Sequence, residues 1–144
     1  MRARPIGQLC GLLLLSLAAT PPAHSAATPA SGMTGDQVTR SSQEGRDFIV
    51  RDITIDPGGS TGWHWHDGTL VGAVKHGTLT HYSANCSIEG VYNPGDPIIE
   101  PAGPDHVHIG RNLGSTPLIL EVIYILPVGK PLAEDAPNPG CPFS

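Results

Sequence analysis

The sequence predicts an all-β domain, an antiparallel barrel or jelly roll assembled from short strands. Short runs rich in Val, Ile, Leu, Thr and Tyr alternate with Gly, Pro, Asn and Asp along the chain, which is the pattern of strands joined by turns. Beyond the N-terminal segment, no helical periodicity persists over a window of about eleven residues. With 18 Gly, 15 Pro and only 15% charged residues, the composition favours tightly turning strands over helices.

The first 25 residues are expected to form a secretory signal peptide. Arg2 and Arg4 precede the apolar run 12–15, and small residues follow at Ala23 and Ser25. A basic start, a short apolar stretch and a small-residue cleavage site are the layout of such a peptide. The apolar stretch is too short to span a bilayer as a mature helix. We therefore expect a secreted or periplasmic protein without membrane contact after cleavage.

Three segments are expected after the signal peptide. Residues 26–45 are rich in Ala, Thr, Ser and Gly and hold few large apolar side chains, which predicts a flexible leader. Residues 46–130 carry the β-type runs and are expected to form one barrel. Residues 131–144 form a Pro-rich tail that is expected to run extended over the outside. The strands are predicted at 48–55, 69–75, 78–82, 98–100, 107–109 and 118–126.

Two cysteines, Cys86 and Cys141, remain once the signal peptide is removed. In an exported protein such a pair indicates a disulfide more readily than a catalytic thiol pair. The bridge would tether the C-terminal tail to the barrel and stabilise the fold by about 4 kcal/mol. Two buried free thiols remain the alternative.

The charge of the mature chain argues against a nucleic-acid partner. Without the signal peptide, six basic residues stand against thirteen acidic ones, a net charge of −7 with histidines neutral. The basic residues are scattered along the chain and form no cationic stripe of the kind that binds a phosphate backbone.

Two H-x-H pairs, His64 with His66 and His106 with His108, are the strongest functional signal. Alternate residues of a strand project from the same face, so two imidazoles at this spacing can reach one ion from one side. Trp63 would then point the opposite way, into packing. A histidine from a neighbouring strand would complete the site, and neutral imidazoles suit Zn, Fe, Mn, Ni or Cu.

The spacing around these pairs resembles that of cupins. The first cupin motif is matched by Gly58, His64, His66 and Gly77, and the second by the segment 95–112, which begins with Gly95 and contains Pro101-x-Gly103. The resemblance runs from about residue 48 to residue 128 and is greatest to small single-domain bacterial cupins of the cupin-2 type. It implies the double-stranded β-helix fold with its ligands inside the barrel.

Two features depart from the cupin pattern. Leu70 stands where the first motif normally has a glutamate ligand, and Val71, on the alternative spacing, is also apolar. We therefore expect a three-histidine site without a carboxylate, which resembles the site of thiol and diketone dioxygenases among cupins. A cupin that has lost its metal remains the alternative.

The second departure concerns the third histidine. His106 lies at the expected distance after Gly103, whereas His108 lies at the expected distance before Asn112. We favour His108, because 107–109 is typical of a strand, and keep His106 as the alternative or a fourth ligand. Two further histidines, His76 and His81, flank a predicted hairpin and are expected to face solvent.

These observations predict an exported metal-binding cupin that acts on or with a small organic ligand through a divalent transition metal, in the manner of a dioxygenase. His64, His66 and His108 are the expected metal ligands, and the sequence identifies no catalytic residue. A non-catalytic module that captures a small molecule or a metal is the alternative from another class. The resemblance also leaves open a homodimer formed through a sheet edge.

Overall fold

The computed structural model describes residues 26–144, and in this range every regular element is a β-strand. The all-β prediction is confirmed. The strands are β1 (Ser31–Gln43), β2 (Arg46–Ser60), β3 (His64–Trp65), β4 (Thr69–His76), β5 (Leu79–Ser83), β6 (Ile88–Tyr92), β7 (Pro97–Glu100), β8 (His108–Arg111), β9 (Leu118–Pro127) and β10 (Glu134–Asp135). Within the described residues, none of the elements is a helix of a length and hydropathy that would cross a bilayer. The predicted signal peptide, 1–25, lies outside the described residues.

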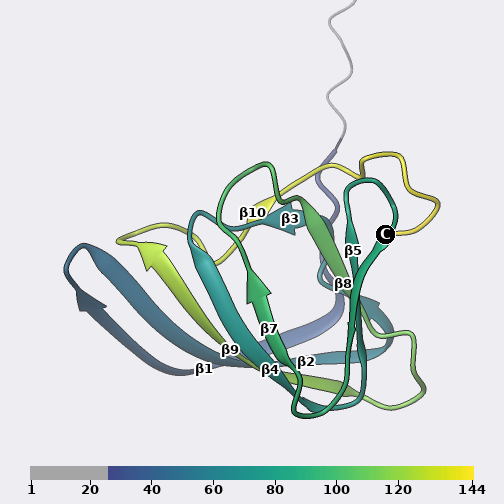
Figure 1. Cartoon of the computed structure of the whole chain (residues 1–144), viewed down its shortest axis with the longest axis horizontal. Coiled ribbons are helices and arrows are strands. Elements are labelled where there is room, and N and C mark those ends of the chain that lie inside the picture. Colours follow the sequence, from purple (N-terminus) through teal and green to yellow (C-terminus); the bar gives the residue numbers. More distant parts are fainter. Residues whose placement is uncertain (1–25) are drawn as a thin grey trace, which may run out of the picture.

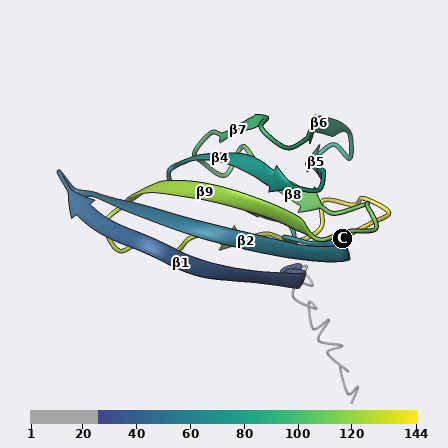
Figure 2. The same ribbon diagram turned by 90° about the horizontal axis from the view of Figure 1, so that it is seen from below.

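The strands pair only antiparallel and form one sheet that curls into a jelly roll, the double-stranded β-helix that the resemblance implied (Figure 1). The sheet runs in the order β10-β3-β8-β2-β9-β4-β7, with β1 added beside β2 and with β5 pairing both β6 and β8. Seen from below, β1, β2, β9, β4 and β7 lie side by side in one curved layer (Figure 2). All six predicted strands are present, whereas β1, β3, β6 and β10 were not predicted as strands.

Alternation along β9 shows how the core is made. Leu118, Leu120, Val122, Tyr124 and Leu126 are buried, while the side chains between them are half-buried or exposed. One face of the strand therefore points into the barrel and the other points out. Isoleucines of β2 and apolar side chains of β4 join the same cluster, so that the core lies inside the curl of the sheet.

The segment predicted as a flexible leader differs from that expectation, because Ser31–Gln43 form β1. This strand is largely exposed, but its backbone pairs with β2 from end to end. The Arg40 guanidinium also donates to the Asp47 carboxylate at 2.7 Å across the hairpin. Few large apolar side chains are needed at this position, because an edge strand is held mainly by backbone hydrogen bonds.

The C-terminal tail is attached to the barrel by the predicted disulfide. Cys86 and Cys141 are bonded, and Cys141 packs in a second apolar cluster around the fully buried Trp63. In the same tail, β10 pairs antiparallel with β3, the strand that carries the first H-x-H pair. The tail therefore forms part of the wall beside the histidines.

Candidate metal centre

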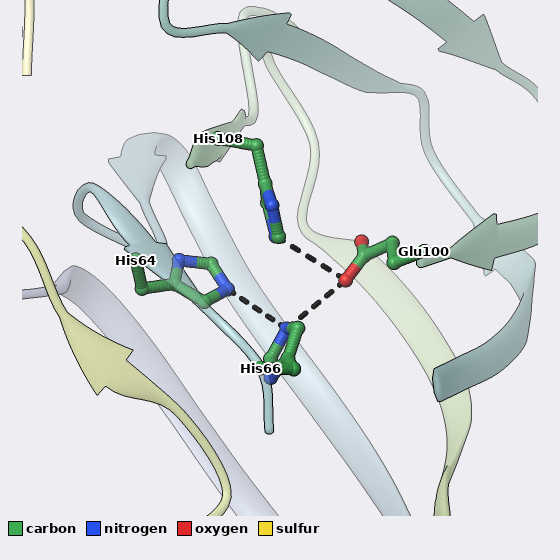
Figure 3. Close-up of side chains that lie close together, drawn as sticks. All are labelled: His64, His66, Glu100 and His108. Carbon is green, nitrogen blue, oxygen red and sulfur yellow. Dashed lines mark hydrogen bonds and ion pairs between the residues drawn. The ribbon is translucent and has the colours of Figure 1, made fainter. Parts of the chain in front are cut away.

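Three of the predicted ligands, His64, His66 and His108, are brought together inside the barrel. His64 on β3 lies directly opposite His108, the first residue of β8, in the antiparallel ladder. His66 follows two residues later, and all three side chains are buried. The ring centroid of His64 lies 4.3 Å from the ring centroid of His108 and 4.8 Å from the ring centroid of His66. Figure 3 shows the three rings pointing toward one point.

Each of these rings is held by a backbone carbonyl at Nδ1. His64 Nδ1 lies 2.9 Å from Gly62 O, His66 Nδ1 lies 2.7 Å from Leu132 O, and His108 Nδ1 lies 2.8 Å from His106 O. A carbonyl oxygen can only accept, so each Nδ1 carries the hydrogen and donates it. In the neutral ring, Nε2 then presents a bare lone pair, which is the atom a metal ion binds.

A carboxylate that the sequence interpretation missed completes the group. Glu100, the last residue of β7, directs its Oε2 to His66 Nε2 at 3.0 Å and to His108 Nε2 at 3.2 Å (Figure 3). It lies directly opposite Leu70 in the ladder between β4 and β7. The acidic ligand expected at position 70 is therefore present one strand away. Strand alternation could have indicated it, because Glu100 shares a strand face with the buried Ile98.

The four ligand atoms fit a single divalent metal ion. They lie within 4.8 Å of one another, and His64 Nε2 is 3.2 Å from His66 Nε2. Neighbouring ligands on one ion with bonds of about 2.1 Å are about 3 Å apart. Two bare Nε2 lone pairs repel at this distance. A cation among them removes this repulsion, and within the described residues Glu100 Oε2 and His108 Nε2 are buried without a hydrogen-bond partner.

The pKa shifts of these side chains favour the protonation states that bind a metal. Burial, together with the rings of His108 and His66, lowers the pKa of His64 to about 3. Burial also lowers the pKa of His108. Although burial opposes it, the rings of His108, His66 and His81 hold the pKa of Glu100 well below its usual range. At neutral pH, His64 and His108 are uncharged and Glu100 is ionised, which are the states that bind a metal without releasing a proton.

His106 does not join this group, although it was kept as the alternative or a fourth ligand. It precedes β8, and its Nε2 lies 2.8 Å from Glu89 Oε1. Within the described residues the metal-type cluster holds His64, His66, Glu100 and His108 only. His106 precedes β8, and although its ring centroid lies 4.7 Å from the ring centroid of His108, its Nε2 is directed to Glu89 and not to the four ligand atoms.

The expectation that His81 faces solvent is wrong. It is 3% exposed on β5 and lies between two carboxylates, with Nε2 3.3 Å from Glu100 Oε1 and Nδ1 3.0 Å from Glu89 Oε2. Although burial opposes it, Glu100 and Glu89 raise the pKa of His81. His81 therefore supports the ligand Glu100 from outside the group. His76, by contrast, is exposed as expected.

Two cavities meet at the metal-type cluster. One, of about 40 Å³, extends into the barrel core between His64, His66, Glu100 and His108 and the apolar side chains of Leu70 and Leu120. The other, of about 150 Å³, lies between the start of β1, the inner face of β2 and the C-terminal tail, and it shares His64, His66 and Tyr124 with the first. A volume of this size holds several waters or one small organic molecule. The cluster is thus adjacent to space for a ligand.

Comparison with protein families then identifies the chain. The family model described as "Cupin domain" (Cupin_2) matches residues 51–125, more than half of the sequence. The chain belongs to the cupin superfamily. Within this cupin, the matched range contains all four members of the metal-type cluster. No match was found among curated protein sequences.

Solved structures support the cupin fold. The polyketide cyclase RemF from Streptomyces resistomycificus superposes with a TM-score of 0.58 at 18% identity, over 86% of this cupin and 90% of that chain. A recombinant oxalate oxidase in complex with glycolate gives a TM-score of 0.55 at 20% identity, over 65% of this cupin and 51% of that chain. KdgF from Halomonas sp. gives a TM-score of 0.52 at 17% identity, over 65% of this cupin and 78% of that chain. This cupin therefore spans about half the length of the oxalate oxidase chain, and identities this low show the fold alone.

Proposed function

We propose that this cupin is an exported, metal-dependent enzyme that acts on a small organic molecule held beside its histidine cluster. The observation that carries the proposal is the donor set, three buried Nε2 atoms and one buried carboxylate oxygen around one point, with a cavity of about 150 Å³ next to it. A structural metal site is usually closed on all sides by protein ligands, whereas a catalytic one keeps access for a further ligand.

A divalent ion bound here would supply Lewis-acid or redox chemistry to the ligand in the cavity. The chain's own residues would do the rest. His64, His66 and His108 hold their Nε2 atoms in place through hydrogen bonds to backbone carbonyls. Apolar side chains such as Ile53 line both cavities and limit water at the cluster.

Export is supported by two features. The basic and apolar N-terminal segment has the layout of a signal peptide, and the bond between Cys86 and Cys141 would persist in an oxidising compartment. Recovery of the mature chain from the periplasm or the medium, with a new N-terminus near residue 26, would test this part of the proposal.

The metal site is tested by metal analysis of the chain purified from its own host. We expect about one equivalent of a divalent transition metal. His108→Ala should abolish binding, and Glu100→Gln should weaken it by at least about 10- to 100-fold, the loss typical of residues that support a metal site. His106→Ala is the matched control and should keep the full equivalent, because His106 pairs with Glu89 outside the cluster.

The position of the carboxylate can be tested separately. Glu100→Leu should lose most of the metal affinity, and Leu70→Glu in the same chain should restore part of it, because the two residues face each other across β4 and β7. Metal-free wild type, or equal losses in His106→Ala and His108→Ala, would contradict the metal site. Retention of metal and ligand without turnover of any ligand would instead indicate a binding module.

A further inference from the structure

Arg51 is a cation on the inner face of a barrel strand. Along β2, Ile49, Ile53 and Ile55 are buried in the core at 3%, 6% and 0% exposure. Arg51 has the same parity and so projects to the same side, where it is half-buried and lines the cavity of about 150 Å³. A guanidinium among core isoleucines loses part of its hydration. This loss costs free energy unless other groups pair with the charge or hydrogen-bond to it.

The protein compensates for this charge only in part. The Arg51 guanidinium donates to Gly35 O on β1, and Gly35 leaves the space that the guanidinium fills, since a Cβ there would lie 2.7 Å from Nη2. Among the described residues, the ion pairs of Arg and Lys join Arg40 to Asp47, Lys75 to Glu121 and Lys130 to Asp67. None of them includes Arg51, so its charge has no carboxylate partner in the described chain.

The cavity places this charge beside the metal-type cluster. His64 and His66 line the same space as Arg51, and Tyr124 stands in the wall with its hydroxyl near the guanidinium. One carboxylate, Asp135, also lines the cavity, but it is exposed at the C-terminal rim and makes no ion pair with Arg51. The enclosed part of the cavity therefore presents a guanidinium at one wall and metal-ligating imidazoles at another.

We infer that this cavity binds a small organic acid, whose carboxylate pairs with Arg51 while the rest of the molecule lies against the histidine cluster. The inference deepens the proposed function and rests on it for the role of the metal. A guanidinium has five N–H donors, and its fork matches the two oxygens of a carboxylate. The small volume restricts the acid to a few carbon atoms. Tyr124 can give a further hydrogen bond to the same ligand.

The test is calorimetric titration of the mature chain, with its metal, using three acids and their neutral amides: glycolate with glycolamide, lactate with lactamide, and succinate with succinamide. We expect at least one acid to bind more tightly than its amide. Arg51→Gln should weaken the acid about 10- to 100-fold and leave the amide unchanged. Arg51→Lys should fall between, because lysine keeps the charge and loses the fork.

Arg46→Gln is the matched control, because Arg46 is an exposed cation on the same strand and does not line the cavity. It should bind the acids as wild type does, and urea unfolding of each variant shows whether the fold is kept. Equal affinity for acids and amides, equal losses in Arg46→Gln and Arg51→Gln, or binding of inorganic phosphate but of none of the acids would overturn the inference.

The same titration with chelator-treated protein separates this inference from the proposed function. Arg51-dependent acid binding in a chain that never holds a metal would sink the metal-dependent function and keep the organic-acid site. A chain that holds one equivalent of metal but binds the acids independently of Arg51 would keep the metal centre and overturn the acid site.

Discussion

The buried neutral ring of His64 is expected to make the free energy of unfolding of the metal-free protein fall as the pH is lowered. Burial, with smaller effects of His108 and His66, lowers the pKa of His64 to about 3 in the folded chain, whereas an unfolded histidine titrates near about 6.5. Between these pH values the unfolded chain binds one proton more at this residue than the folded chain. The free energy of unfolding therefore falls with falling pH, by about 1.4 kcal/mol per pH unit from this group.

Over the two units from about pH 6 to about pH 4, this one residue removes about 2 to 3 kcal/mol of stability. That is a large part of the roughly 5–15 kcal/mol available to a domain. The lowered pKa of His108 adds a loss of the same sign in this window, but His108 is present in wild type and in the variant, so its contribution cancels when the two slopes are compared. The raised pKa of His81 causes stability to be lost only as the pH rises above the ordinary histidine value, and the lowered pKa of Glu100 causes loss only below the ordinary glutamate value.

The assay is urea unfolding of chelator-treated wild type and His64→Asn at several pH values in this window. Asparagine does not titrate here, and its amide can still donate to Gly62 O, the partner of His64 Nδ1. The slope of stability against pH should be shallower in the variant by about 1.4 kcal/mol per unit. Ile53→Val, in the wall of the same cavities, is the control, since it should cost about 1 kcal/mol at every pH. Equal slopes in wild type and His64→Asn would refute the reasoning that a neutral imidazole is buried at position 64.

Two further predictions concern stability. Replacing both cysteines by serine should lower the free energy of unfolding by about 4 kcal/mol, because the bond between Cys86 and Cys141 spans 55 residues of sequence; urea unfolding with and without reductant measures this, and a loss below about 1 kcal/mol would contradict it. The same variant should also bind metal more weakly, since the tail it releases carries the carbonyl of Leu132 that holds His66. Gly68→Ala should destabilise the chain by at least about 2 kcal/mol, because a Cβ there would lie 2.0 Å from Ile125 O on β9; an unchanged urea midpoint would show that the two strands can separate at this point without cost.

The sequence by itself determined the fold class and most of the metal-type cluster. Alternation and turn residues are local properties, so the runs around Ile53 and Leu120 could be assigned to strands without knowing their partners. The spacing of His64 and His66 placed both imidazoles on one side of the chain for the same reason. The cupin motifs added His106 or His108 as the distant ligand, and the strand-like run 107–109 favoured His108, which the structure places opposite His64.

Other features were decided only by the tertiary structure. His106 and His108 have the same parity, so the periodicity of a strand could not separate them; the structure does, because β8 begins at His108 and Glu89 on β6 contacts His106. Residues 31–43 have too few apolar side chains to signal a strand, and they become one through backbone pairing with β2. Glu100 enters the cluster because β7 pairs with β4, which sets it across from Leu70. In each case the deciding contact joins residues far apart in the chain. Alternation could place Glu100 on the inner face of its strand, but a local pattern does not reveal which strand pairs with it.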